Sequence, residues 1–192
     1  MNEYQTTSTE DAIKEVLRQF GIPVDRWGSG SAKTVANLLD EIEAGETTLV
    51  KDEQELLRKT GFVALNIICQ GTDGVLELYK KEQIFSDGRR RKRNMNWSAG
   101  EKLLRGENPN VALERLLYKE ELVQIAKGIT GIAPIGETQE TKESPSYPGL
   151  KTEFIRYSFS GELEAAFFKS EGYILEESDK TTYFAWRPRK PE

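Results

Sequence analysis

Residues 106–122 read GENPNVALERLLYKEEL, and this stretch does most to decide the fold that the sequence predicts. Gly106 and Glu107 come just before Pro109, which suits the first turn of a helix because the missing proline N–H has no helical partner there. Apolar side chains then recur at helical spacing, at Ala112, Leu113, Leu116 and Leu117. The stretch therefore predicts a loop followed by a helix with one apolar face.

Two further helices are expected before residue 60. Thr9 can cap the first, which ends near Gly21 and places Ile13, Val16, Leu17 and Phe20 on one face. Ser31 can cap the second, which ends near Gly45 and carries the stripe Val35, Leu38, Leu39 and Ile42. We expect residues 1–60 to be a helical N-terminal extension and residues 61–192 to be the main domain.

The hydrophobic pattern changes to that of strands from about residue 62. The run FVALNIIC (62–69) suits a central strand, VLELYKKEQIF (75–85) suits a second, and Asp87-Gly88 marks a tight hairpin turn. More strands are expected after the motif helix, at EFIRYSF, GYILE and TTYFAW. Glycine, proline and charges in residues 136–150 predict a long irregular loop that serves as a binding loop or lid. Together these elements predict an α/β (α+β) domain with a mixed sheet and helices packed against it.

Composition limits the chemistry. The chain has 192 residues, 37% of them hydrophobic, and a net charge of −5, which describes an ordinary soluble protein. It has no histidine, so histidine-based nucleophile systems and histidine-ligated zinc are excluded. The single cysteine, Cys69, lies in an apolar run and is expected to fill the core of a protein in a reducing compartment. The polar N-terminus and the lack of a long apolar stretch predict a cytoplasmic protein that does not enter a membrane.

The stretch 106–122 resembles the Nudix box, the signature of enzymes that hydrolyse nucleoside diphosphates linked to another moiety. Gly106, Glu107, Pro109, Arg115 and Glu120 stand at the family's spacing, with Ala112 and Leu117 between them. The resemblance implies a Nudix-like α/β/α sandwich with a mixed β-sheet. It also implies a magnesium cluster held by glutamates of the helix.

The sequence departs from the box at the glutamates themselves. Leu116 and Lys119 stand where the box has carboxylates, Leu122 replaces its closing glycine, and Gly100 stands one residue too early. On a helix, positions 116, 119 and 120 project within an arc of roughly 100°. Magnesium needs hard oxygen ligands, which leucine lacks, and a lysine ammonium group repels the ion. We therefore expect a degenerate box, a catalytically inactive pseudoenzyme, and no metal or other cofactor.

Two interpretations of Glu120 stay open. A divergent magnesium-dependent pyrophosphohydrolase could use Glu120, with Glu107 and carboxylates of flanking segments, namely Glu101, Glu137, Glu140 and Glu143. Alternatively, Glu120 lies in the apolar face and is held by a cation such as Lys119, so that an ion pair replaces the metal. In that case the protein is a phosphate-ligand-binding or regulatory module, or a protein–protein interaction module.

The densest positive charge is GRRRKR at residues 88–93. On a hairpin, Arg89, Arg91 and Arg93 share one face, and the intervening Arg90 and Lys92 share the other. Guanidinium groups suit phosphate oxygens, so this face is a candidate clamp for a phosphate-containing small molecule or nucleotide. Nucleic acid, with Trp97 as a stacking surface, is a weaker alternative, and a charged edge that only prevents sheet association is the simplest one.

The candidate ligand-binding residues are therefore the three arginines of one hairpin face and two cations of the motif helix, namely Arg89, Arg91, Arg93, Arg115 and Lys119. A homo-oligomer or a protein partner is left open by the sequence.

Overall fold

The computed structural model describes residues 2–3, 9–30, 32–51, 54–72, 74–92, 95–119 and 122–189. The chain divides into two compact units. Unit 1 comprises residues 1–62, 102–108 and 137–156, and unit 2 comprises residues 63–101, 109–136 and 157–192. The predicted boundary near residue 60 between an extension and a main domain stays a prediction. No helix within the described residues is long and apolar enough to cross a membrane.

The first helix of unit 1, α1 (Glu10–Gln19), begins where the sequence predicts. Its N-cap is Thr9, whose hydroxyl accepts a hydrogen bond from the backbone N–H of Ala12 at 3.3 Å. This bond satisfies one of the N–H groups that a helix leaves without a partner at its start. The predicted cap is confirmed.

The second helix, α2 (Val35–Glu43), begins later than predicted, and its N-cap is Thr34 and not Ser31. The Thr34 hydroxyl accepts from the N–H of Asn37, and the Asn37 side chain accepts from the N–H of Thr34, both at 3.1 Å. Only a cap at Thr34 places Asn37 three residues on, where this reciprocal arrangement can form. Ser31 itself lies outside the described residues.

The strands of unit 1 are antiparallel wherever a register is defined. β1 (Asn2–Glu3) pairs with β2 (Thr48–Lys51), and β2 pairs with the start of β3 (Leu56–Gly71), so that Thr48 lies opposite Lys59. Unit 1 also contains the second half of β7 (Ile129–Ser144) and the first half of β8 (Tyr147–Leu163).

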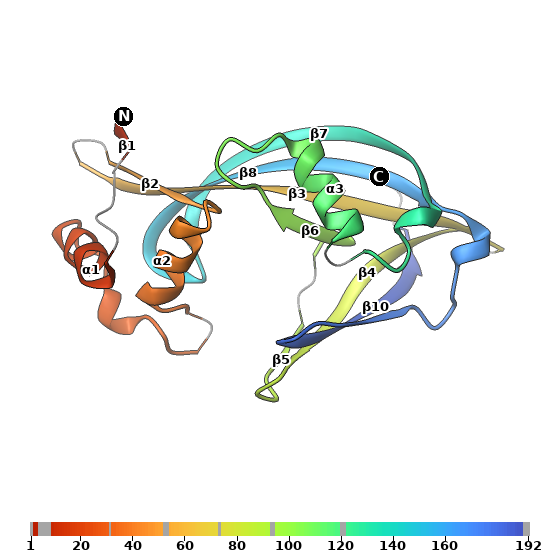
Figure 1. Ribbon diagram of the computed structural model, residues 1–192, viewed down its shortest axis with the longest axis horizontal. Coiled ribbons are helices and arrows are strands. Elements are labelled where there is room, and N and C mark those ends of the chain that lie inside the picture. Colours follow the sequence, from red (N-terminus) through yellow and green to blue (C-terminus); the bar gives the residue numbers. More distant parts are fainter. Residues whose placement is uncertain are drawn as a thin grey trace. The chain divides into compact units, whose positions relative to one another are not determined.

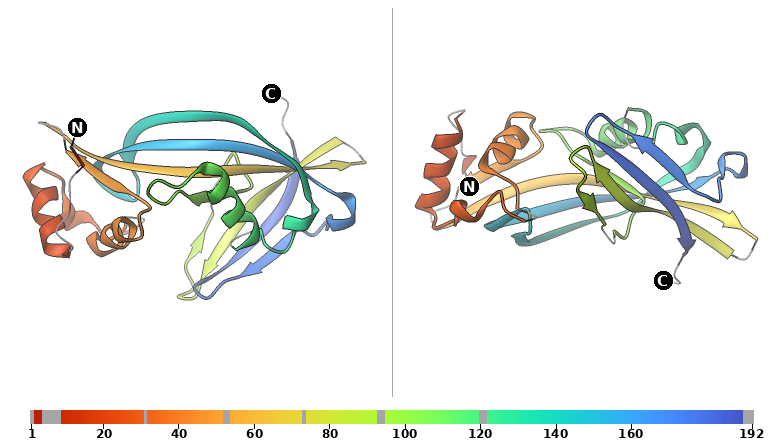
Figure 2. Two further views of the ribbon diagram at one scale, coloured as in Figure 1. Left: turned by 45° about the horizontal axis from the view of Figure 1, so that its top comes forward. Right: turned by 90° about the horizontal axis from the view of Figure 1, so that it is seen from below.

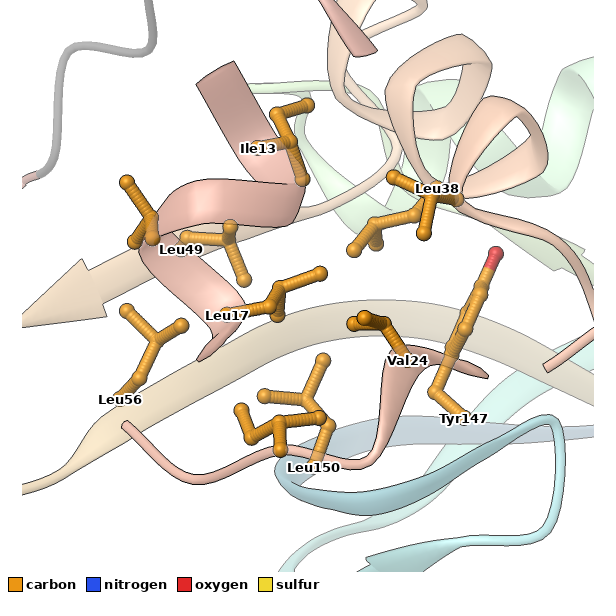
Figure 3. Packing of buried hydrophobic residues seen from close by; sticks show 11 residues of the cluster. Ile13, Leu17, Val24, Leu38, Leu49, Leu56, Tyr147 and Leu150 are labelled. Atoms are coloured by element: carbon orange, nitrogen blue, oxygen red, sulfur yellow. The ribbon is translucent and has the colours of Figure 1, made fainter. Parts of the chain in front are cut away.

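The core of unit 1 is formed by side chains of both helices and of three strands. Figure 3 shows Ile13 and Leu17 of α1 and Leu38 of α2 gathered with strand residues, and these side chains are fully or almost fully buried. The strand residues of this cluster are Leu49, Leu56, Tyr147 and Leu150. The apolar helix stripes predicted from the sequence therefore face a sheet.

Unit 2 contains a series of antiparallel strand pairings, of which β4 with β10 is the longest that has a defined register (Figures 1 and 2). The end of β3 pairs with β4 (Gly74–Phe85), and β4 pairs along its length with β10 (Lys180–Pro188). β10 pairs in turn with β9 (Tyr173–Glu176), while β5 (Arg90–Arg91) folds back on β4. The predicted strands at 62–69, 75–85, 172–176 and 181–186 and the turn at Asp87-Gly88 are confirmed.

The helix of unit 2, α3 (Pro109–Tyr118), buries Ala112, Leu113, Leu116 and Leu117. The chain continues through the short 3-10 helix η2 (Ala126–Gly128) into β7. Two other 3-10 helices are η1 (Val24–Arg26) in unit 1 and η3 (Ala165–Phe167) in unit 2. β6 (Ala99–Lys102) pairs with β3. The described residues thus form a large sheet with three α-helices, an α+β architecture.

The predicted loop at residues 136–150 is wrong. These residues belong to β7 and β8, which pair with each other as long neighbouring strands and turn at Pro145-Ser146 (Figure 1). Charged and threonine side chains are exposed on both faces of β7, so the alternation that identifies a half-buried strand is missing from its sequence.

Candidate functional site

The apolar Nudix-like positions of the motif helix α3 are buried. Leu116 is fully buried, and its neighbours Ala112 and Leu117 are buried with it. The position where the Nudix box carries a carboxylate is therefore a packing position in this chain. A carboxylate there would lose its hydration without gaining a partner, which costs several kcal/mol.

The helix ends earlier than the sequence predicts. α3 stops at Tyr118, and Lys119 lies in a turn with its N–H bonded to the carbonyl of Arg115 at 2.9 Å. Val123, expected on the apolar face, is 50% exposed instead. Glu120, with its predicted ion pair to Lys119, lies outside the described residues.

Arg115 of α3 forms an ion pair with Glu101 of β6, at 2.5 Å between Nη1 and Oε1. About a fifth of each side chain is exposed. This arginine, predicted as a ligand-binding residue, therefore pairs with a strand residue of the same unit. Arg115 is thereby fixed in a structural contact, as is Glu101, one of the flanking carboxylates considered for a metal site.

Glu107 orders the loop that leads into α3. Its Oε2 atom accepts a hydrogen bond from the N–H of Leu104 at 2.8 Å, and the N–H of Glu107 donates to the Leu104 carbonyl at 2.9 Å. The flanking carboxylates Glu137, Glu140 and Glu143 lie along β7 in unit 1. Among the described residues, no three carboxylate or cysteine side chains come together as a metal-binding group.

The basic hairpin is the second predicted site, and its geometry is well defined. Gly88 has φ +83°, and the Phe85 N–H donates to the Arg89 carbonyl at 2.9 Å, which closes the turn. A positive φ at this position favours glycine because a Cβ atom would crowd the backbone. The turn brings β5 back against β4, with Ile84 opposite Arg90.

Arg89 and Arg91 converge on one aromatic ring. Their guanidinium carbons lie 5.1 and 4.9 Å from the centroid of the Phe85 ring. Arg90 points elsewhere, because its Nη1 atom lies 3.6 Å from Oε2 of Glu82. The predicted alternation is thus confirmed for these three arginines, and we call Arg89 and Arg91 the arginine pair. Arg93 lies outside the described residues.

Asp87 forms an ion pair with Arg89, one residue of the arginine pair. Its Oδ2 atom lies 2.6 Å from Nε of Arg89, and its Oδ1 accepts from the Arg89 N–H at 3.0 Å. The hydrogen bonds from Arg89 lower the pKa of Asp87. The Asp87 carboxylate is therefore ionised at neutral pH and pairs with Arg89 at the turn.

The structure does not gather all five predicted ligand-binding residues. Within unit 2, β5 and α3 lie well apart (Figure 1), so Arg115 and Lys119 belong to a different place from the arginine pair. Trp97, considered as a stacking surface, lies against Gly100, where an added Cβ would come 3.1 Å from the indole nitrogen. The aromatic residues Phe159, Tyr173 and Phe184 are buried, as expected of core residues.

Two comparisons with known proteins do not assign the chain to a family. Neither the protein-family models nor the curated proteins contain a match to it. The function must therefore be argued from the residues themselves.

Sequence reasoning missed a cluster of charged groups buried in unit 1. Glu41 of α2 binds Arg58 of β3 at 2.6 Å through Oε2, and both side chains are almost fully buried. Its Oε1 atom lies 2.5 Å from Nζ of Lys33 and 3.1 Å from Nζ of Lys102. Lys102 also binds Glu46 at 2.5 Å. We call these five residues the ion cluster.

The ion cluster controls the ionisation of Glu41. Burial alone raises the pKa of a carboxyl, but the charges of Arg58, Lys102 and Lys33 outweigh burial and lower the pKa of Glu41 to about 2. The Tyr147 ring lies 5.0 Å from the Arg58 guanidinium carbon, and burial raises the pKa of its hydroxyl. The signal in the sequence was weak: Glu41 lies three residues after Leu38 and next to Ile42, on the apolar side of α2.

Proposed function

We propose that this protein is not a hydrolase, and that it binds a phosphate-bearing small molecule at the arginine pair. The observation that carries the proposal is the convergence of Arg89 and Arg91 on the Phe85 ring. Two guanidinium groups held on one face can donate several hydrogen bonds to the oxygens of one phosphate or pyrophosphate group.

The surroundings of the arginine pair favour an anionic ligand. Residues 87–91 carry one acid, Asp87, against Arg89, Arg90 and Arg91, and Asp87 pairs with Arg89. The Phe85 ring limits where the two guanidinium groups can lie, which reduces the side-chain entropy lost on binding. Arg89 remains largely exposed, with 69% of its side chain accessible, so a ligand can reach it from solvent.

The motif helix supports the non-catalytic part of the proposal. Leu116 fills the core where a Nudix enzyme has a metal-binding carboxylate, and Lys119 carries the wrong charge for a neighbouring ligand position. The resemblance to the Nudix box, and the α/β/α sandwich that it implies, stay predictions. A divergent magnesium-dependent hydrolase that uses Glu120 is the main alternative.

A ligand panel tests the proposal. We would measure the melting temperature with inorganic pyrophosphate, nucleotide sugars, dinucleotides and oxidised nucleotides, because a ligand that binds the folded state raises it. We expect at least one of these compounds to raise the melting temperature of the wild type. The double variant Arg89→Ala/Arg91→Ala should lose the shift.

Arg90→Ala is the matched control, since it removes a neighbouring arginine that points to Glu82 instead. It should keep most of the shift. If no compound shifts the melting temperature, or if all three arginines contribute equally, the arginine pair is not a site. Magnesium-dependent release of phosphate from any compound in the panel would favour the hydrolase instead.

A further inference from the structure

The second half of β7 has an open backbone edge. Among the described strands, β7 pairs only with β8, so the backbone N–H and C=O groups along its other edge have no strand partner. From Glu137 to Glu143 every side chain is exposed. An edge of this kind is where an extended peptide can add a further strand.

The two halves of β7 differ in how well they can accept a strand. The first half contains Gly131, with φ +59°, and Pro134, which has no N–H to donate. Positive φ and proline both interrupt a regular ladder, so this half is protected against pairing. The segment Glu137–Glu143 contains neither glycine nor proline and lies within unit 1. We call it the open edge.

The charges of the open edge favour a positively charged partner. It carries Glu137, Glu140 and Glu143 against one cation, Lys142, which leaves a net charge of −2. Lys142 is already engaged within the strand, because its Nζ lies 2.6 Å from Oε1 of Glu140 and 5.4 Å from the Phe154 ring centroid. Glu137 and Glu143 form no ion pair within the described residues and lie on the same face of the strand, since their positions differ by an even number.

A second copy of the same strand is a poor occupant in the register that pairs the whole open edge with itself. Antiparallel pairing centred on Glu140 would place Glu140 opposite itself and Glu137 opposite Glu143. Like charges directly opposite destabilise a strand pair. A basic strand would instead place cations beside Glu137 and Glu143.

We propose that the open edge is a docking site for an extended, basic peptide segment of a partner protein, which adds to the sheet as a strand beside β7. Backbone hydrogen bonds supply the pairing, and lysine or arginine side chains at alternate positions meet Glu137 and Glu143. This site is separate from the arginine pair, and neither depends on the other.

The test uses a fluorescent peptide of alternating lysine and threonine, matched in length to the open edge, with binding followed by anisotropy. Two further peptides carry N-methyl groups on one set of alternate residues or on the other. Strand addition uses only one edge of the peptide, so we expect one methylated peptide to bind at least about tenfold more weakly and the other to bind normally. Equal binding of both would mean that charge alone attracts the peptide, and would overturn strand addition.

Protein variants test the charges. Glu137→Gln/Glu143→Gln should weaken binding roughly fivefold, while Glu140→Gln, whose partner is Lys142, should change it by less than about twofold. Hydrogen exchange should show new protection on alternate amides of the open edge when the peptide binds. Protection confined to other strands would contradict the proposal. Protection of these amides without peptide, in a dimer, would assign the edge to a second copy and contradict it equally.

Discussion

Glu41 and Arg58 form an ion pair of 2.6 Å inside unit 1, with only about 7% and 5% of their side chains exposed. Charges buried in this way lose their hydration and depend on each other for compensation. The pair joins α2 to β3 beside the apolar core, so it fixes the helix at one position on the sheet. The stability of unit 1 should therefore depend strongly on both residues.

Glu41→Gln should destabilise the protein by about 3 to 5 kcal/mol, because Arg58 would keep its buried charge without a counterion. Denaturant unfolding of the wild type and the variant measures the difference. Glu43→Gln is the control: Glu43 is exposed on the same helix, and its loss should change the free energy of unfolding by less than about 0.5 kcal/mol. Equal effects of the two substitutions would rule out a stabilising role for the pair.

The contribution of Glu41 should depend on pH. Its pKa is about 2 in the folded protein, below the ordinary value of 4.5. A lowered folded-state pKa stabilises the protein above pH 4.5, and this stability is lost as the pH falls towards 2. The difference in unfolding free energy between wild type and Glu41→Gln should be constant from pH 7 to about 5 and shrink below that. A difference that stays the same down to pH 3 would be inconsistent with the lowered pKa.

Leu116→Glu puts a carboxylate back at the Nudix-like position, and we expect it to destabilise the protein by about 3 kcal/mol or more without creating hydrolase activity. The reason is that Leu116 is fully buried in unit 2. Lys119→Glu, at an exposed position, should be nearly neutral for stability. Thermal unfolding and a magnesium-dependent phosphate assay measure both properties. A stable and active Leu116→Glu variant would show that the helix still frames a catalytic site.

Gly172→Ala should cost about 2 to 4 kcal/mol. Gly172 has φ +85°, and an added Cβ would lie 2.0 Å from the carbonyl oxygen of Phe184, which is backbone and cannot move aside easily. Gly88→Ala separates the cost of the clash from the cost of the left-handed backbone, because Gly88 has a similar φ but open space around it. It should cost only about 1 to 2 kcal/mol, the penalty of the left-handed backbone alone. Similar losses at both glycines would mean that the clash with Phe184 is relieved by relaxation.

The sequence correctly predicted helix starts and a hairpin turn, because these features depend on residues close together in the chain. Thr9 caps α1, Asp87-Gly88 turns the hairpin, and Pro109 opens α3, because in each case a backbone requirement is met by residues a few positions apart. The alternation of Arg89, Arg90 and Arg91 followed from strand geometry in the same way.

The sequence-based predictions were wrong mainly where the structure depends on residues far apart in the sequence. Residues 137–143 of β7 have no buried side chain, so this polar sequence was taken for a loop, although it forms a strand that pairs with β8. The end of α3 at Tyr118 has no glycine to mark it. Glu41 carried no sign of its partner Arg58, seventeen residues away on another element. The Nudix resemblance and the cytoplasmic location remain predictions.

The most direct test of the central claim is a calorimetric titration of the wild type, Arg89→Ala/Arg91→Ala and Arg90→Ala with the phosphate compound that stabilises the wild type most. Removing both guanidinium groups should weaken binding at least about tenfold, since each charge-assisted hydrogen bond contributes about 1.5 to 3 kcal/mol. Arg90→Ala should bind within about threefold of the wild type. An unchanged affinity in the double variant would contradict a phosphate site at the arginine pair.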